Sequence, residues 1–356
     1  VKKFKDVISI GELALDGNTR PVNGILASVE FAVKQGYKKI LLPKENAREA
    51  ALIPGIKIIP AATLKEAVMH LKGKLEALPI SPPSITHNRI ISVDMAMVKG
   101  QAQAKRALEI AAAGGHNILL CGAPGAGKTL MARALSGILP SMSLDEMLEV
   151  SKIYSVAGLL PKHLPLITER PFRPVHHTAS GMSIVGGGNM PGPGEISLAH
   201  RGVLFMDEIA EFPRNVLEVL RQPMEDHVIT VSRVRGTCTY PCKFTLIAAM
   251  NPCPCGYKNV ENARQECNCS AREVQRYEKK LSGPLLDRID MFVYINPVDF
   301  SELTSNTKQE STSDVRNRVE KANSIQLIRF GQSKIKCNSE MGSTDIEKFC
   351  NTENEA

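Results

Sequence analysis

The 356-residue sequence has no tryptophan, and aromatic residues make up only 4% of it. Few rings are therefore available to stack on nucleic-acid bases, which favours contact with the phosphate backbone over base readout. No apolar run approaches the ~18 residues needed to span a membrane, and no secretory leader is visible. These absences predict a cytoplasmic protein with no membrane partner.

Charge and cysteine content narrow the class further. The 44 Lys and Arg residues outnumber the 37 Asp and Glu residues by seven, a mild excess that permits an anionic partner such as nucleic acid without requiring one. The nine cysteines are odd in number, and a disulfide framework is not expected in a reducing compartment. Because Val1 falls within a pattern typical of a strand, we expect the chain to be a piece of a longer protein.

Changes in periodicity divide the chain into four segments. Residues 1–78 alternate short strands and helices, and the prolines of residues 79–88 predict a semi-rigid linker. Residues 89–300 alternate helices with apolar strands, which predicts a parallel sheet flanked by helices. The three strands expected in this sheet lie at residues 117–121, 203–206 and 244–249. Residues 301–356 are largely polar and contain one helical stretch, residues 315–327.

A complete nucleoside-triphosphate-binding loop follows the first of these strands. It fits G-x-x-x-x-G-K-[ST] and consists of Gly122, Ala123, Pro124, Gly125, Ala126, Gly127, Lys128 and Thr129. Its glycines allow successive backbone N–H groups to face phosphates, the lysine reaches the outer phosphates, and the threonine hydroxyl is a ligand for Mg²⁺. The motif predicts binding of ATP and Mg²⁺.

Further polar residues follow the other two strands. Asp207 and Glu208 come directly after residues 203–206, where Asp207 would hold Mg²⁺ and Glu208 would orient or deprotonate the attacking water. Asn251 follows residues 244–249 and would sense the γ-phosphate or position the water.

Arg288 stands in an apolar helix end, Leu285 to Asp290. An arginine of this kind neutralises charge on the γ-phosphate, in some cases from a neighbouring subunit. A salt bridge to Asp287 or Asp290 is the alternative.

These four elements in this order resemble the AAA+ ATPases. The segments His176–Ser180, Val185–Gly188, Pro193–Gly202, Asn251–Gly256 and Ser282–Asp290 resemble, more narrowly, the bacterial magnesium-chelatase-like ATPases of the ComM and YifB type, which are similar to MCM helicases. The resemblance implies an ATP-driven ring, a hexamer, that acts as a helicase or branch-migration factor on single-stranded or branched DNA during natural transformation.

In this group, insertions in the ATPase core project hairpins towards the pore of the ring. Residues 181–193 and 228–236 are the corresponding segments, and the second carries Arg233 and Arg235 near its tip. Two arginines on a pore loop would contact phosphates without reading sequence. An exposed hairpin with solvated charges is the alternative.

The flanking segments resemble parts of larger domains. Residues 1–78 resemble part of a Lon-protease-like (ribosomal-S5-like) domain, but Leu26, Ala27 and Ser28 stand where Lon-type enzymes carry a catalytic lysine, so no peptidase activity is expected. Residues 301–356 resemble the beginning of a helical lid. None of its arginines matches the phosphate-sensing position of the group, which predicts ATP binding with slow hydrolysis.

Four of the nine cysteines form two closely spaced C-x-C pairs after Asn251. They are Cys253, Cys255, Cys267 and Cys269. Four thiolates bind Zn²⁺ tetrahedrally and can tie down a loop that lacks its own core, so a structural zinc site is one hypothesis. Four reduced free thiols are the other.

Three functions remain open from the sequence. The first is a DNA-translocating ATPase, and the second is a chelatase-type motor that remodels a protein partner for metal insertion. The third is a nucleotide-dependent assembly scaffold.

Overall fold

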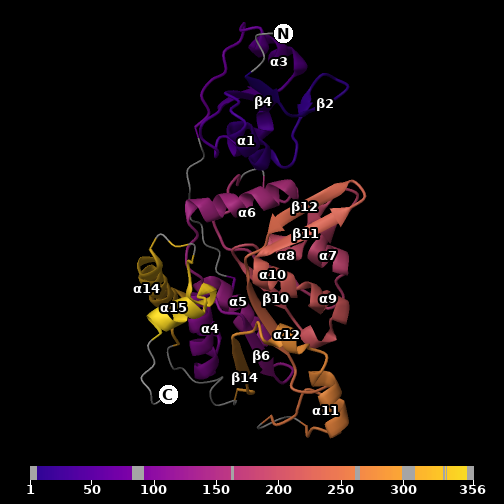
Figure 1. Cartoon of the computed structure of the whole chain (residues 1–356), viewed down its shortest axis with the longest axis vertical. Helices are drawn as coiled ribbons and strands as arrows, with labels where there is room; N and C mark the ends of the chain where they lie inside the picture. The colour runs from indigo at the N-terminus through magenta and orange to yellow at the C-terminus, as the bar shows by residue number, and fades with distance from the viewer. Residues whose placement is uncertain are drawn as a thin grey trace.

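The structure is a computed structural model that describes residues 6–81, 92–161, 164–260, 265–298, 309–331, 333 and 335–350. A small N-terminal α/β unit lies at one end of the molecule, and helix α6 lies directly beneath it (Figure 1). Residues 82–88 of the expected linker lie outside the described part. The division into domains therefore stays a prediction.

The N-terminal unit is built on a three-stranded parallel sheet, in the order β1–β4–β5. Its strands and a small hairpin are β1 (Val7–Ser9), β2 (Glu12–Leu13), β3 (Thr19–Arg20), β4 (Lys39–Pro43) and β5 (Lys57–Ala61). Its helices are α1 (Ile25–Lys34), α2 (Ala47–Ala50) and α3 (Leu64–Leu71). The alternation of short strands and helices expected for this segment is confirmed.

A five-stranded parallel sheet forms the centre of the molecule, in the order β14–β6–β13–β10–β7. The strands are β6 (Ile118–Gly122), β7 (Phe172–Val175), β10 (Val203–Met206), β13 (Thr245–Met250) and β14 (Met291–Ile295). The three predicted strands are confirmed to within one residue, and they are the three inner strands of the sheet. The two edge strands, β7 and β14, were not predicted.

Helices cover both faces of this sheet, which explains why its inner strands are continuous apolar runs. One face packs against α4 (Ala102–Gly114), α5 (Lys128–Ile138) and α14 (Thr312–Phe330). The other packs against α7 (Gly181–Val185), α8 (Glu195–Leu198), α9 (Arg214–Val219), α11 (Ala271–Glu278) and α12 (Gly283–Leu286). Successive side chains alternate between the faces, so that Phe205 lies in the first core and Leu204 in the second.

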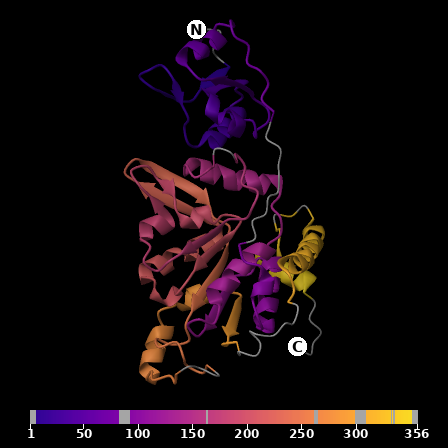
Figure 2. The same cartoon turned by 180° about the vertical axis from the view of Figure 1, so that it is seen from behind.

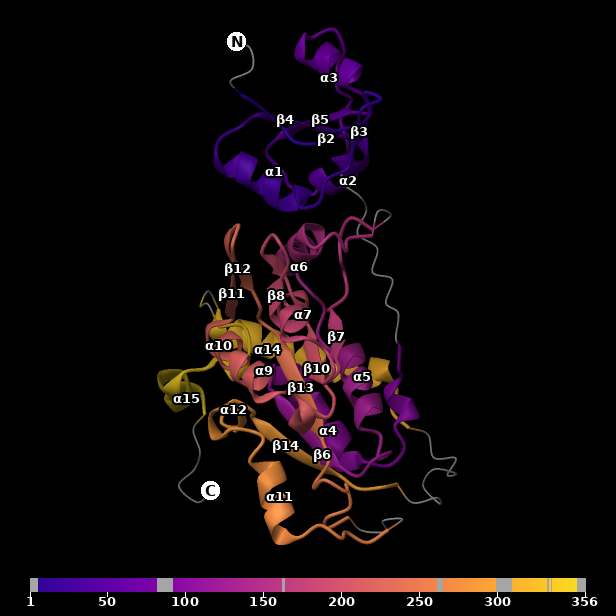
Figure 3. The same cartoon turned by 90° about the vertical axis from the view of Figure 1, so that its right-hand side faces the viewer.

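Two hairpins lie beside the sheet, beneath the N-terminal unit (Figures 1 and 3). They are β8–β9 (Gly186–Gly187 and Gly192–Pro193) and β11–β12 (Val228–Arg233 and Gly236–Pro241). The short helix α10 (Arg221–Asp226) leads into β11. The expected hairpin at residues 228–236 is confirmed, and residues 181–193 form α7 and the β8–β9 pair.

Helix α6 (Leu144–Val156) lies between the N-terminal unit and the larger α/β core and contacts both. It begins at a capping box formed by Ser143 and Glu146. Near its C-terminal end, Lys152 Nζ donates to Glu30 Oε2 of α1 at 3.0 Å, and Ser155 O accepts from the N–H of Gly24 at 3.0 Å. These contacts fix the small unit on the core through side-chain and backbone groups.

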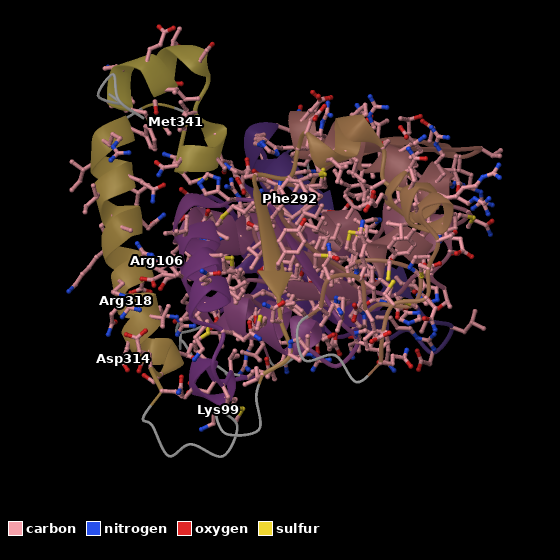
Figure 4. The ribbon with its side chains drawn as sticks, turned by 90° about the horizontal axis from the view of Figure 1, so that it is seen from below. Lys99, Arg106, Phe292, Asp314, Arg318 and Met341 are labelled. Atoms are coloured by element: carbon pink, nitrogen blue, oxygen red, sulfur yellow. The ribbon has the colours of Figure 1, made fainter. Side chains whose placement is uncertain are left out.

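Helix α14 packs on the flank of the core beside α4, as the view from behind also shows (Figure 2), and α15 (Ser343–Phe349) follows it in the chain. Arg318 of α14 donates to Glu109 of α4 at 2.7 Å, and Arg106 lies 3.3 Å from the same carboxylate. Figure 4 shows both arginines at the boundary between the two helices. The helix expected at residues 315–327 is confirmed. Among the described residues, no helix is long and apolar enough to cross a bilayer.

Candidate functional site

The phosphate loop joins β6 to α5 at the carboxyl edge of the sheet. Gly127 has φ = +94°, a left-handed conformation that glycine adopts without strain, and it directly precedes the first residue of α5. Gly122 lies so close to β14 that a Cβ there would come within 2.4 Å of Ile295 O. The strand, the turn and the helix start expected from the motif are therefore all present.

Lys128 lies at the centre of this loop and is only 9% exposed. Its ammonium donates to Gly122 O at 2.7 Å, to Ala123 O at 2.9 Å and to Asn251 Oδ1 at 3.0 Å. Asn251 reaches it because β13 is the neighbour of β6 in the sheet. Burial lowers the pKa of Lys128 below its ordinary value, because the charged form loses its hydration. The ammonium is thus held inside the loop, where it can bind an anionic oxygen.

Thr129 and Asp207 come together although they lie far apart in the chain. Thr129 Oγ1 donates to Asp207 Oδ2 at 2.9 Å, which joins the start of α5 to the end of β10. A hydroxyl and a carboxylate oxygen are ligands that Mg²⁺ prefers, usually together with water and phosphate oxygens. The donor set therefore fits Mg²⁺, and these are the two residues that would hold it.

Glu208 follows Asp207 in a left-handed backbone conformation with φ = +50°, which is uncommon for a residue with a side chain. Its Oε2 lies 3.0 Å from Nδ1 of His177, which follows β7. The His176 ring lies beside the His177 ring, with 4.1 Å between centroids. The two histidines and Glu208 form one polar cluster at the carboxyl edge of the sheet. His176 and His177 belong to a segment that carries the family resemblance, but no role for them could be predicted because β7 was not predicted.

Arg288 lies at the opposite edge of the sheet from these residues. Its backbone carbonyl accepts from Asn117 Nδ2 at 3.0 Å, at the start of β6, whereas the phosphate loop follows the end of that strand. Five residues of strand separate the two edges by about 16 Å. Within one chain, Arg288 is therefore not part of the nucleotide site. Its guanidinium pairs with Glu225 of α10, so the salt-bridge partner expected from sequence, Asp287 or Asp290, was wrong.

The two hairpin arginines have different surroundings. The guanidinium of Arg233 donates to Gly186 O at 2.7 Å and to Ser232 O at 2.8 Å, which ties the β11–β12 hairpin to the β8–β9 hairpin. Arg235 is exposed at the tip of the β11–β12 hairpin, next to Val234, whose side chain is fully exposed. Arg235 is therefore available to a ligand, while Arg233 holds the two hairpins together.

The four clustered cysteines converge after β13. Cys253 Sγ lies 3.3 Å from Cys255 Sγ and 3.7 Å from Cys267 Sγ, and all four sulfurs lie within 4.8 Å of one another. Cys269 directly precedes Ser270, which caps helix α11. The two C-x-C pairs thus form a single four-sulfur group, as the zinc hypothesis requires.

The groups at the carboxyl edge have complementary chemistry. A buried cation and the N–H groups at the start of α5 attract polyphosphate. The hydroxyl of Thr129 and the carboxylate of Asp207 offer oxygens for a divalent cation. Glu208 adds a carboxylate suited to accepting a proton. The arrangement is that of a site for phosphoryl transfer to water.

Comparison with known protein families agrees with this chemistry. A family model described as "Magnesium chelatase, subunit ChlI" matches residues 94–303. A second model, "Subunit ChlI of Mg-chelatase", matches residues 1–46. The first match extends from before the phosphate loop to beyond β14, and so includes every strand of the central sheet.

Several relatives resemble the chain over most of its length. YifB of Escherichia coli is 43% identical over 355 residues, which cover 99% of this chain and 68% of the relative. Competence protein ComM of Haemophilus influenzae is 39% identical over 349 residues, which cover 96% of this chain and 66% of the relative. The chain thus spans about two thirds of the length of these relatives. Lon protease of Rhizobium meliloti is 35% identical over 89 residues, which cover 22% of this chain and 11% of the relative.

Among solved structures, NtrX from Brucella abortus aligns over 90% of this chain and 72% of its own, with 16% identity and a TM-score of 0.37. The family model and the relatives that match nearly the whole chain establish the family without this structure. This chain belongs to the magnesium chelatase subunit ChlI family of AAA+ ATPases.

Proposed function

We propose that this chain is the ATP-hydrolysing part of a ring-forming motor that moves along DNA. The observation that carries the ATPase part is the convergence of Lys128, Thr129, Asp207, Glu208 and Asn251 at one edge of the sheet. These residues come from three strands and from segments up to 123 positions apart. Their convergence supplies groups that bind phosphate, hold Mg²⁺ and activate water for phosphoryl transfer.

Each residue has a role in this proposal. The loop N–H groups and Lys128 bind the β- and γ-phosphates, and Thr129 and Asp207 hold Mg²⁺, which when bound neutralises charge on those phosphates. Glu208 orients the attacking water and accepts its proton. Asn251, which already contacts Lys128, positions the water near the γ-phosphate.

Arg288 acts on the site of a neighbouring subunit in this proposal. It lies at the far edge of its own sheet, so it can reach a γ-phosphate only across an interface between two copies. This geometry supports a closed ring, and the family resemblance points to six subunits.

The β11–β12 hairpin is the proposed DNA contact. Its exposed Arg235 offers a cation for phosphates, and Arg233 keeps the hairpin in place by its bonds to Gly186 and Ser232. With few aromatic residues in the chain, such a contact would follow the backbone of single-stranded or branched DNA without reading its sequence. The name of one relative, competence protein, favours a role in DNA uptake. The proposed helicase or branch-migration activity in recombination rests on the resemblance of the sequence motifs to MCM-like ATPases.

A chelatase-type motor that remodels a protein partner for metal insertion is the second candidate. The description of the matching family, magnesium chelatase, favours it. The two candidates share the nucleotide site and differ in what the hairpin tip contacts.

Phosphate release measured with and without forked DNA distinguishes them. The DNA motor predicts stimulation by DNA that weakens as salt rises, and loss of this stimulation in Arg235→Ala. Arg272→Ala is the matched control, because Arg272 is an exposed arginine on α11, at the end of the molecule away from the hairpins (Figure 1). Indifference of the wild type to DNA would refute the DNA motor and leave the chelatase-type motor.

The N-terminal unit is proposed to be a Lon-like fold without peptidase chemistry. Ser28, on α1, donates to Gly24 O at 2.9 Å, and Lys34 pairs with Glu30 at 3.1 Å. The two side chains are thus engaged with different partners. Incubation with unfolded casein should give no cleavage, and cleavage abolished by Ser28→Ala would overturn this assignment.

A further inference from the structure

The four cysteine sulfurs have the spacing of a tetrahedral metal site. The Sγ–Sγ separations are 3.3, 3.5 and 3.7 Å among Cys253, Cys255 and Cys267, with Cys269 within 4.8 Å of each. Four sulfurs at the usual Zn–S distance of about 2.3 Å lie about 3.8 Å apart. A disulfide requires about 2.0 Å and would join only two of the four.

The surroundings of the cluster favour bound thiolates over four free thiols. The N–H of Lys258 points to Cys253 Sγ at 3.3 Å, the kind of hydrogen bond that supports a metal-bound thiolate. Cys253 itself has no exposed surface. Of the described residues between Pro252 and Ser270, only Cys253 and Gly256 are buried, so this segment has almost no apolar core. A metal cross-link would replace that core.

The same segment lies against the phosphate loop. Gly256 follows the first cysteine pair, has φ = +89°, and donates its N–H to Cys253 O at 3.0 Å. A Cβ at Gly256 would come within 2.6 Å of Pro124 Cδ and 3.8 Å of Asn251 Cγ. The loop that the cysteines close is therefore in direct contact with one residue of the phosphate loop and one polar residue of the nucleotide site.

We propose that the four cysteines bind one Zn²⁺, and that this metal holds Gly256 against Pro124 so that zinc occupancy sets the affinity for ATP. The zinc part stands on the sulfur geometry alone, and the coupling part rests on the proposed function. Loss of the metal frees the backbone around Cys255 and Gly256. Gly256 then no longer packs against Pro124 and Asn251, and ATP binds more weakly.

Zinc content tests the first part. The purified protein should contain about one zinc per chain by mass spectrometry, and Cys269→Ser should contain far less. Cys238→Ser is the matched control, because Cys238 is an exposed thiol on β12 outside the cluster. Replacement of zinc by Co²⁺ in the wild type should give the near-ultraviolet absorption of thiolate-to-cobalt charge transfer, a readout that does not depend on the folding of a variant. Metal-free wild-type protein with no such absorption on adding Co²⁺ would overturn the site.

Nucleotide affinity tests the coupling. Gly256→Ala should keep its zinc and bind a fluorescent ATP analogue about tenfold more weakly, because its Cβ displaces Pro124. Gly36→Ala is the control for backbone strain, since Gly36 has φ = +83° and no atom within 4 Å of its Cβ position. Unchanged affinity in zinc-loaded Gly256→Ala would refute the contact with Pro124, and equal affinity of the zinc-loaded and zinc-free wild type would refute the coupling. A wild type that holds zinc but binds no nucleotide would refute the proposed function and leave the zinc site standing.

Discussion

Replacement of Lys128 by methionine is a direct test of the nucleotide site. In the structure the ammonium donates to two backbone carbonyls and one amide oxygen, all neutral acceptors. When polyphosphate binds, the ammonium exchanges these neutral acceptors for anionic phosphate oxygens. Because the ammonium is charged, its bonds fall in the range of about 1.5–3 kcal/mol; those to neutral acceptors lie near the lower end, at about 1.5–2 kcal/mol, and those to anionic oxygens near the upper end, at about 3 kcal/mol.

Two such exchanges strengthen binding by about 2.5 kcal/mol, which corresponds to about 60-fold in Kd. Lys128→Met should therefore bind MgATP about 60-fold more weakly. Its free energy of unfolding should change little, because the variant loses the hydrogen bonds of Lys128 but no longer buries a charged group at a residue that is 9% exposed.

Isothermal titration calorimetry with MgATP measures the affinity, and urea denaturation measures the stability. Lys152→Met is the matched control, because Lys152 is a half-buried lysine with a carboxylate partner, Glu30, and lies on α6 away from the phosphate loop. An affinity of Lys128→Met within about threefold of the wild type, in a folded protein, would refute this account of the loop.

Three further outcomes are expected. Burial lowers the pKa of Lys128, whereas bound polyphosphate favours its charged form. The affinity for MgATP should therefore be highest at pH values below the lowered pKa and should fall as the pH rises through it. Lys128→Arg should show no such fall in affinity, because arginine keeps its charge. Gly122→Ala should lower the free energy of unfolding by about 1–3 kcal/mol in urea denaturation, because its Cβ meets Ile295 O at 2.4 Å; an unchanged midpoint would argue against this close approach. Arg288→Ala should leave the Kd for MgATP unchanged and lower turnover of the assembled ring by about 10³-fold, and weakened binding in the isolated chain would count against action across an interface.

The phosphate loop and the three inner strands could be predicted because their signals are local. Residues 203–206 are apolar throughout, as a strand covered on both faces must be. Since parallel strands share their carboxyl edge, the positions of Lys128, Asp207 and Asn251 after such strands were enough to predict their convergence.

The two edge strands could not be predicted in the same way. Strand β7 contains Pro174, which is tolerated there because an edge strand leaves one side of its backbone unpaired. Strand β14 exposes Phe292 and Tyr294, so it lacks a continuous buried run. Because β7 was not predicted, the contact between His177 and Glu208 could not be predicted either, since it depends on where that strand ends.

Contacts between segments that are distant in the chain could not be predicted from the sequence either. Nothing in the local pattern distinguishes Arg233, which bonds to Gly186, from the exposed Arg235 two residues later. The pairing of Arg288 with Glu225 likewise depends on how α10 packs. Polar partners of this kind are set by tertiary structure, and sequence spacing suggested only the nearer carboxylates.

Phosphate release by the wild type and by Glu208→Gln, each at saturating MgATP, tests the central claim most directly. The account predicts that both proteins bind MgATP with similar affinity and that the variant releases phosphate about 10²- to 10⁴-fold more slowly, because an amide cannot accept a proton from water. Equal rates of release from the two proteins would contradict it.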